Sequence, residues 1–354
     1  MRQNPRHARL TAERRLPPAR LRVLPSSLRR SLASSLGLVA AATLAMVFGS
    51  AACDRSGSTA SRPARTITVG FSQIGAESAW RTAETESIRS EARQRGVTLK
   101  FFDAQQKQEN QIKALRTFIA QKVDAIILAP VVESGWEPVL KEAKRAGIPV
   151  VLVDRGVDVS DDSLYATLIA SDFVEEGRMA ARWLAEKLGG KGNVVELQGT
   201  PGSAPAIDRK KGFEEVLTQY PDLKIIKSQS GDFTRARGKE VMEAFLKAEP
   251  GRIHAVYAHN DDMALGAIQA IELAGLRPGQ DIIIVSIDGV RAAFEAMIAG
   301  KLNCSVECNP LLGPAAFDAI EQLLAGQVLP KWIKVKDEVF DQSVAAEVIH
   351  QRKY

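Results

Sequence analysis

The sequence predicts an α/β protein made of two doubly wound, Rossmann-like lobes that are joined by a three-strand hinge. From residue 66 onward, short apolar runs rich in β-branched residues alternate with amphipathic helical patterns. The runs are continuously apolar, which is typical of parallel strands covered by helices on both faces. About ten such runs are too many for one ordinary sheet, so two sheets are expected.

The expected strands are short, and several end at polar residues. They cover residues 67–72, 99–103, 125–129, 150–154, 165–170, 193–198, 224–228, 255–258, 282–287 and 303–306. Helical patterns between them include 109–122, 137–146, 175–188, 236–248 and 263–274. Glycine after a helix end supplies the left-handed turn that leads into the next strand. This signal occurs at Gly96, Gly147, Gly275 and Gly300.

Both lobes are expected to be discontinuous in the chain. Residues 66–169 and 309–332 are predicted to form the N-terminal lobe, and residues 170–308 and 333–354 the C-terminal lobe. The chain would then cross between the lobes three times, near Ala170, Asn309 and Trp332.

The net charge of +5 argues against nucleic-acid binding once its distribution is considered. Residues 1–52 hold nine Arg and a single acid, Glu13, and contribute +8, which leaves −3 for the rest of the chain. A mildly acidic body lacks the basic surface that binds phosphate backbones.

Residues 1–52 have the anatomy of an export signal. A basic region extends to Arg30, an apolar segment covers residues 36–48, and small residues follow at 49–52. Because the apolar segment is shorter than the ~20 residues that span a bilayer, no membrane span is expected after cleavage. Cys53 follows the small residues directly, and residues 53–65 form a Ser/Gly-rich tether, as in bacterial lipoproteins. Acylation of Cys53 and plain cleavage beside an incidental cysteine are both left open.

The other two cysteines, Cys304 and Cys308, are expected to be free thiols. Residues four apart on a strand are about 13 Å apart, and a disulfide requires a Cα separation of under about 7 Å. The sequence has no GxSxG, P-loop or GxGxxG motif after the first strand, and no zinc or acidic calcium-loop spacing. We therefore expect a protein that is not an enzyme, with no catalytic residue, metal or cofactor.

Polar residues gather where the expected strands end, whereas the strand starts show few. Open α/β sheets bind ligands at this carboxyl edge. Planar Asp, Asn and Arg groups can each bridge two adjacent hydroxyls. An aromatic ring can cover the C–H face of a sugar. Equal numbers of Asp and Arg compensate each other's buried charge. The pattern favours a neutral polyhydroxylated ligand. These residues are Gln73, Asp103, Asp154, Arg155, Asn260, Asp261, Asp262 and Asp288.

Long stretches of the body carry a family resemblance. They include VGFSQIGAESAWRTAET from Val69, NVVELQGTPGSAPAIDRKKGF from Asn193 and AHNDDMALGAIQAI from Ala258. Residues 66–354 resemble the periplasmic sugar-binding proteins of the ribose/galactose class that feed ABC importers, and within that class most closely the galactofuranose-binding member. The resemblance implies a type I periplasmic-binding-protein fold and a periplasmic location, with membrane contact only through a lipid anchor.

The resemblance also implies a set of ligand-binding residues. Trp80 corresponds to the aromatic plate, and the last family position falls near Cys308. The implied ligand-binding residues are Glu77, Trp80, Arg81, Asp154, Arg155, Arg209, Phe233, Asn260 and Asp288.

Each of these residues also has a purely structural interpretation. Asp154, Asn260 and Asp288 could cap helices, because capping is the commoner role of Asp and Asn after a strand. Trp80 and Phe233 could be core aromatics. Arg209 could belong to a solvated face. We assign Asp261 and Asp262 to capping and the helix N-terminus, Trp136 to packing, and His254 and His259 to positions flanking a strand.

The expected function is that of an exported monomeric receptor. It would capture a monosaccharide, close by hinge bending and present the closed form to a membrane ABC permease. The resemblance implies that this monosaccharide is galactofuranose. A sensor that presents its closed form to a chemoreceptor or kinase, and an exported carbohydrate enzyme, remain the alternatives. A sugar-responsive repressor of the same fold would need an N-terminal helix-turn-helix, where this chain has an export signal.

Overall fold

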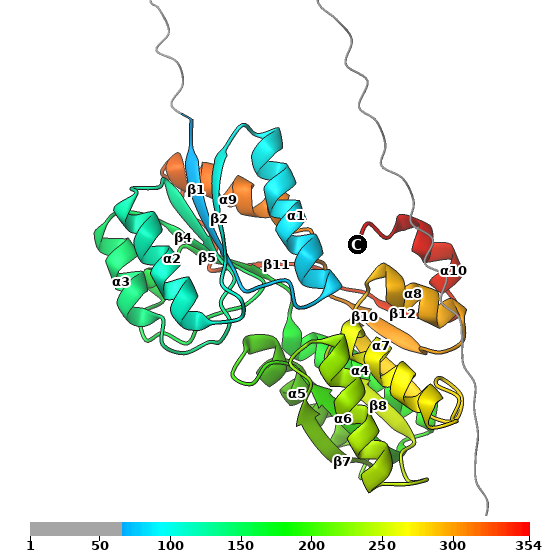
Figure 1. The fold of residues 1–354 in the computed structure, drawn as a ribbon. Helices are drawn as coiled ribbons and strands as arrows, with labels where there is room; N and C mark the ends of the chain where they lie inside the picture. Colours follow the sequence, from blue (N-terminus) through cyan, green and yellow to red (C-terminus); the bar gives the residue numbers. More distant parts are fainter. Residues whose placement is uncertain (1–65) are drawn as a thin grey trace, which may run out of the picture. The chain divides into compact units, whose positions relative to one another are not determined.

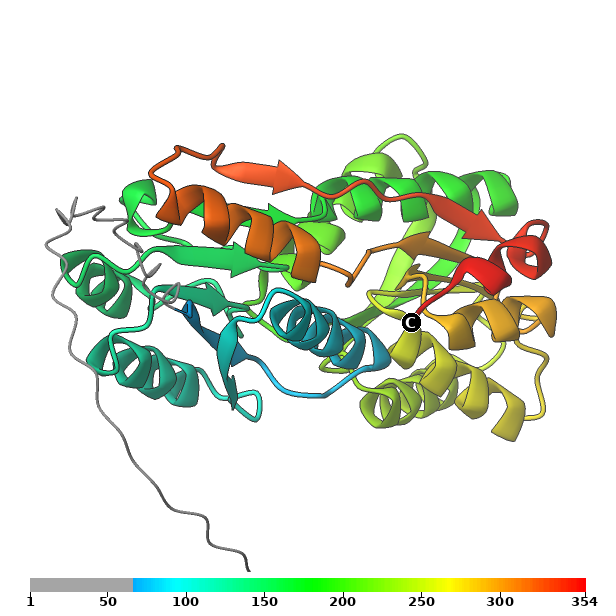
Figure 2. The ribbon, with the colours of Figure 1, turned by 90° about the horizontal axis from the view of Figure 1, so that it is seen from above.

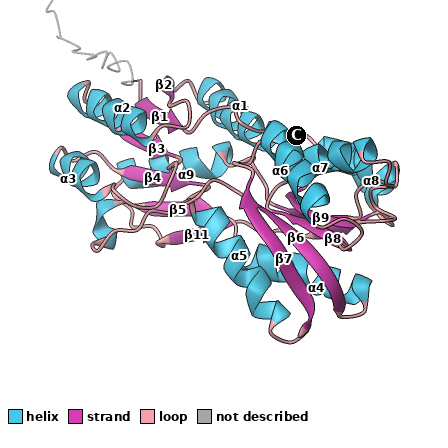
Figure 3. Cartoon of the chain, turned by 60° about the horizontal axis from the view of Figure 1, so that its bottom comes forward, coloured by secondary structure: helices cyan, strands magenta, loops and turns pink. Residues whose placement is uncertain are grey.

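Residues 66–354 form two six-stranded sheets, which Figures 1 and 3 show as separate groups of strands. The computed structural model describes residues 66–354. The predicted export signal, Cys53 and the predicted tether lie outside the described residues. Within the described part, no helix is both long enough and apolar enough to cross a bilayer.

The first sheet has the strand order β11-β5-β4-β3-β1-β2, and all of its strands are parallel. Its strands are β1 (Thr68–Gln73), β2 (Thr98–Asp103), β3 (Ala125–Leu128), β4 (Val150–Val153), β5 (Thr167–Ala170) and β11 (Trp332–Lys334). The helices of this lobe are α1 (Ala79–Gln94), α2 (Gln108–Ala120), α3 (Glu137–Arg145) and α9 (Gly313–Leu324), with a short 3-10 helix at Asp162–Leu164.

The second sheet has the order β12-β10-β9-β8-β6-β7, and only β12 is antiparallel to its neighbour. Its strands are β6 (Lys191–Gln198), β7 (Asp222–Ser230), β8 (Ala255–Ala258), β9 (Ile283–Asp288), β10 (Cys304–Glu307) and β12 (Val339–Asp341). The helices are α4 (Phe173–Leu188), α5 (Ala204–Leu217), α6 (Arg235–Ala248), α7 (Asp261–Leu273), α8 (Arg291–Ile298) and α10 (Ala345–Val348), followed by a 3-10 turn at Ile349–Gln351.

Alternating side chains of the central strands fill two separate cores in the first lobe. In β4, Val151 and Val153 pack with α1 and α9 on one face, whereas Val150 and Leu152 pack with α2 and α3 on the other. A strand that is buried on both faces has no polar position along its length, which explains the continuous apolar runs of the sequence.

The predicted α/β class with two doubly wound lobes is confirmed. Each expected strand overlaps an observed one, and the chain passes between the sheets after β5, after β10 and between β11 and β12. The prediction did not include β11 and β12, because three-residue edge strands are too short to show a period. The boundaries given above for the two lobes remain a prediction. Cys304 and Cys308 are free and buried, as expected.

Two glycines let α4 and α5 approach each other very closely. A Cβ atom on Gly177 would lie 2.2 Å from the carbonyl oxygen of Arg209, and one on Gly212 would lie 1.9 Å from that of Val174. Only hydrogen fits at these positions. The close approach brings Glu176 of α4 to Arg209 of α5, with Oε2 and Nε 2.7 Å apart.

We predict that Gly212→Ala destabilises the protein by about 3 kcal/mol or more, because the added methyl group forces the two helix backbones apart. Urea unfolding measures the change. Gly96→Ala is the control: its Cβ meets nothing within 4 Å, so only its left-handed backbone is strained, at a cost of about 1 kcal/mol. Equal losses in the two variants would contradict the close-packing argument.

Candidate functional site

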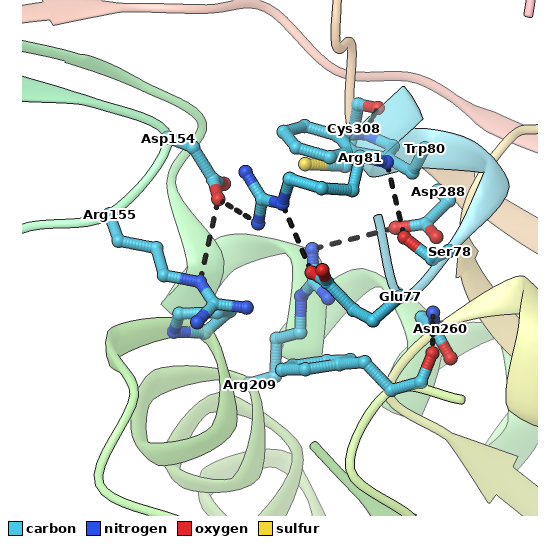
Figure 4. A pocket seen from close by; sticks show the side chains of 12 residues that line it. Glu77, Ser78, Trp80, Arg81, Asp154, Arg155, Arg209, Asn260, Asp288 and Cys308 are labelled. Carbon is cyan, nitrogen blue, oxygen red and sulfur yellow. Dashed lines mark hydrogen bonds and ion pairs between the residues drawn. The ribbon is translucent and has the colours of Figure 1, made fainter. Parts of the chain in front are cut away.

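A cavity lies between the carboxyl ends of the two sheets, and it contains all nine residues predicted as ligand contacts (Figure 4). Three further residues line it that were not among these nine, namely Ser78, Pro205 and Cys308, and the resemblance had placed the last family position near Cys308. The complete lining is Glu77, Ser78, Trp80, Arg81, Asp154, Arg155, Pro205, Arg209, Phe233, Asn260, Asp288 and Cys308. Of the other strand-end residues, Gln73 and Asp103 do not line the cavity.

The lining residues come from strand ends and from the helices that follow. Asp154 directly follows β4, Asn260 is the second residue after β8, and Asp288 is the last residue of β9. Residues 77–81 join β1 to the start of α1, and Arg209 projects from α5. The topology therefore brings together residues that are more than 200 positions apart.

Three lining residues have a backbone conformation that non-glycine residues rarely adopt. The φ angles are 62° at Asp154, 59° at Phe233 and 137° at Asp288. Such a conformation costs of order 1–3 kcal/mol and persists where the surroundings enforce it, which is typical of ligand-binding and catalytic sites. Here it occurs on both sides of one cavity, at strand ends for Asp154 and Asp288 and three residues after β7 for Phe233.

In the first lobe, Arg81 is the centre of a buried charge network. Its Nη2 lies 2.6 Å from Asp154 Oδ2, its Nε lies 3.1 Å from Glu77 Oε1, and its Nη1 donates to Glu84. Burial lowers the pKa of Arg81, but the three carboxylates outweigh burial and hold this pKa well above its usual value. The guanidinium is thus permanently charged and held in place on three sides.

Glu84 supports this network from behind the cavity wall. It is fully buried, it accepts from Arg81, and it accepts a 2.9 Å hydrogen bond from Gln73 Nε2. Burial raises the pKa of Glu84 to about 7, even though Arg81 acts in the opposite direction. The prediction missed Glu84, although its position three residues after Arg81 on a helix was a usable signal.

The second arginine of this lobe, Arg155, packs across the cavity. Its Nη1 donates to the carbonyl of Val131 at 2.9 Å, and its guanidinium lies 5.2 Å from the ring centroid of Phe233 in the other lobe. Burial and the neighbouring Arg81 lower the pKa of Arg155 to about 10, so it stays charged at neutral pH.

In the second lobe, Arg209 has the equivalent central place. Its Nε bonds Glu176, its Nη1 donates to the carbonyl of His259 at 2.6 Å, and its Nη2 lies 4.0 Å from Asp288 Oδ1. Arg209 is only 3% exposed, so the solvated-face interpretation is wrong. No local sequence signal pointed to Glu176, which lies on a different helix.

Asn260 both lines the cavity and caps α7. Its Oδ1 accepts from the backbone N–H of Met263 at 3.0 Å, and its Nδ2 donates to the carbonyl of Phe233 at 3.1 Å. The N-cap is therefore Asn260 and not Asp261 or Asp262, so the capping part of their assignment is wrong. Their assignment to the helix N-terminus is confirmed, because both lie in the first turn of α7. Asp261 instead accepts from the backbone N–H of Val290 at 2.9 Å.

The aromatic residues serve the core and the cavity together. Trp80 and Phe233 are 5% and 4% exposed, and both pack in the apolar core of the second lobe while lining the cavity. Trp80 Nε1 donates to the carbonyl of Cys308 at 2.5 Å, which fixes the plane of its ring. Trp136, predicted to be a packing residue, is fully buried outside the cavity.

Three buried polar atoms of the lining make no hydrogen bond to any described residue. They are Glu77 Oε2, Arg155 Nε and Asp288 Oδ2. Burial raises the pKa of Asp288 well above its usual value, with Arg209 opposing the shift. Buried polar groups are costly unless they are hydrogen-bonded, so these atoms suit a ligand that both donates and accepts. Hydroxyl groups do both.

The lining is balanced in formal charge, with the acids Glu77, Asp154 and Asp288 facing three arginines. Such a balance suits an uncharged ligand. Residues 66–354 contain no group of three His, Cys, Asp or Glu side chains that could hold a metal ion. His254 and His259 lie outside the lining. His259 is buried with Nε2 3.0 Å from Glu196 Oε1.

We predict that Glu84 makes the stability of the protein depend on pH. A carboxyl group whose pKa is higher in the folded state than in the unfolded state favours folding at low pH, and this contribution is lost as pH rises from about 4.5 to about 7. The shift corresponds to at most about 3 kcal/mol. Glu84→Gln removes the titrating group, so urea unfolding should show wild type losing stability relative to the variant between pH 4.5 and 8. A difference that does not change with pH would contradict this assignment.

Comparisons with known proteins agree with the geometry. The family model described as "periplasmic binding protein domain" matches residues 69–327. The galactofuranose-binding protein YtfQ of Escherichia coli is 55% identical over 291 residues, which cover 81% of this chain and 92% of the relative.

Two solved structures are similar over most of their length. The binding protein of an arabinose ABC transporter from Shewanella, bound to α- and β-L-arabinofuranose, is 59% identical with a TM-score of 0.80, and the match covers 81% of this chain and 96% of that chain. A Mycobacterium smegmatis protein in complex with β-D-fucofuranose is 52% identical with a TM-score of 0.80, and the match covers 82% of this chain and 96% of that chain. The chain belongs to the periplasmic binding protein family, as a sugar-binding protein of the ABC-transporter class and not an enzyme.

Proposed function

We propose that the protein captures a monosaccharide in its furanose form, with galactofuranose and L-arabinofuranose as the leading candidates, and delivers it to an ABC importer. The observation that carries this proposal is the set of three buried polar atoms without a hydrogen bond, Glu77 Oε2, Arg155 Nε and Asp288 Oδ2, inside a charge-balanced cavity. Of these, Arg155 Nε lies 3.4 Å from Asp154 Oδ2 in an ion pair. The ring form is suggested by three similar proteins whose names state a furanose ligand.

The nine lining residues named from the sequence are proposed to contact the sugar. Asp154 and Arg155 come from the first lobe, and Arg209, Asn260 and Asp288 come from the second, so one ligand touches both lobes. A ligand that bonds both lobes binds the closed form better than the open form and shifts the population toward closure. Moving that equilibrium from 1:99 to 99:1 takes about 5.5 kcal/mol of differential affinity.

The closed form is proposed to be the species that the permease accepts. We further propose that the receptor is a monomer with the lobe boundaries given above, and that membrane contact is confined to a lipid anchor at Cys53. These proposals come from the sequence pattern and from the family.

We predict that Asp154→Ala weakens sugar binding by about 2–5 kcal/mol, because Arg81 and Arg155 each lose a buried counter-charge. Isothermal calorimetry measures the change. Asp318→Ala is the control, since this carboxylate is 58% exposed and pairs with Arg95 on the surface of the same lobe. Unchanged affinity in Asp154→Ala would reject the assignment of Asp154.

We predict that the bound sugar is a furanose. L-Arabinose and D-galactose labelled with carbon-13 at C1 are each added to the protein, and the C1 chemical shift of the bound form distinguishes the two ring sizes. At a free-ligand concentration of 100 times Kd, binding should stabilise the fold by about 2.7 kcal/mol, which a thermal-shift assay detects. A bound pyranose would refute the ring assignment, and no stabilisation by any monosaccharide of a broad panel would refute the function.

A further inference from the structure

The first turns of α1 and α7 meet across the cleft. Ala79 is the first residue of α1, between the cavity residues Ser78 and Trp80, and Asp262 is the second residue of α7. The backbone N–H of Ala79 donates to Asp262 Oδ2 at 2.8 Å. Because α1 belongs to the lobe of the first sheet and α7 to that of the second, this hydrogen bond joins the two lobes (Figure 2).

Asp262 does not line the ligand cavity, although it lies close to it. Its second oxygen, Oδ1, accepts from Nε and Nη2 of Arg235 at 3.0 and 2.8 Å. Arg235 is the first residue of α6 and thus lies in the same lobe as Asp262. This pair holds the carboxylate in one orientation before the lobes meet, and pre-orientation lowers the entropic cost of the contact.

The electrostatics of α1 favour an acidic partner at this point. A helix N-terminus carries a partial positive charge and unpaired N–H groups. The first turn of α1 contains no acidic residue, and its cap is the hydroxyl of Ser78, which accepts from the N–H of Arg81 at 3.1 Å. The first turn of α7, in contrast, has two acids, Asp261 and Asp262. In the closed form, Asp262 supplies the negative charge that α1 lacks.

We infer that Asp262 is a closure residue: its carboxylate binds the N-terminus of α1 across the cleft and stabilises the closed form without touching the ligand. Another contact between the lobes that lies outside the cavity lining is the hydrogen bond from the N–H of Glu133 to the carbonyl of Gly202 at 3.0 Å. That bond joins two backbone atoms, whereas the bond at Asp262 uses a side chain and can be removed by a substitution.

This role has a defined consequence for affinity. The apparent Kd equals the intrinsic Kd of the closed form divided by the fraction of protein that is closed. Removing the contact lowers the closed fraction and leaves every ligand contact in place. Since the contact must break before the ligand can leave, its loss should raise the dissociation rate more than it lowers the association rate.

The experiment removes the two partners of the bond separately and together. Asp262→Ala removes the acceptor. Ala79→Pro removes the donor, and the structure tolerates proline there: the first helical position favours it, and Ser78 before it is extended, with φ −142° and ψ 163°. We expect each variant to bind sugar about tenfold more weakly, as for a charge-assisted hydrogen bond of about 1.4 kcal/mol. The double variant should be no weaker than the weaker single variant, because both changes remove the same bond.

Two further measurements make the outcome decisive. Glu272→Ala removes an exposed carboxylate from the same helix, where it pairs only with Lys301 of the same lobe, and it should leave affinity unchanged. Paramagnetic relaxation from a spin label on one lobe reports the closed fraction without any sugar, and this fraction should fall in Asp262→Ala. The spin-label measurement needs no sugar, so it still tests the inference if no candidate sugar binds. Failure of every candidate sugar to bind would count against the proposed function alone.

The inference is overturned if Asp262→Ala keeps the affinity and closed fraction of the wild type. It is also overturned if the losses from Asp262→Ala and Ala79→Pro add in the double variant. Should Asp262→Ala fail to fold, Asp262→Asn keeps the size of the side chain and removes its charge. We expect it to bind more weakly than wild type, and wild-type affinity would again reject the role of Asp262.

Discussion

The architecture of the site depends on two buried arginines that are each held from behind by a buried glutamate. Arg81 is fixed by Glu84 in the first lobe, and Arg209 is fixed by Glu176 in the second. Without Glu84, Arg81 would keep only the cavity carboxylates of Glu77 and Asp154, and without Glu176, Arg209 would keep only Asp288 at 4.0 Å. A buried charge with fewer partners is more costly than a fully paired one. The pairing also fixes the direction of the remaining donors, so each lobe presents a rigid set of polar groups to the cleft.

The rest of the fold serves to bring these two sets face to face. Parallel strands covered on both sides place their carboxyl ends at one edge of each sheet, and the three crossings let those edges oppose each other. Close helix packing adds to this. The glycines at 177 and 212 let α4 and α5 approach until Glu176 reaches Arg209, so a packing constraint in the core sets the position of a charge in the cleft.

The strained residues of the cavity lining also fit this arrangement of sheets and cleft. Asp154 and Asp288 have left-handed or near-left-handed backbone conformations at strand ends, where the sheets behind them are rigid enough to maintain the strain. Asp262 differs from them, because it contacts the opposite lobe and not the cavity. Groups suited to the ligand and groups suited to closure therefore lie side by side on the same turn of α7.

The sequence by itself determined the α/β class, the order of most elements and the residue types at the strand ends, because these follow from short-range patterns: continuous apolar runs, helix periodicity and terminal glycines. The resemblance to a family added Glu77, Trp80, Arg81, Arg209 and Phe233. No local pattern distinguishes Arg209 from a surface arginine or Phe233 from a core phenylalanine. Only the tertiary structure decided that Glu84 and Glu176 support the two arginines, that Asn260 and not Asp261 caps α7, and that Asp262 reaches α1. Each of these facts depends on contacts between side chains on different elements, and the energy of a buried charge depends on its three-dimensional neighbours rather than on its neighbours in the chain.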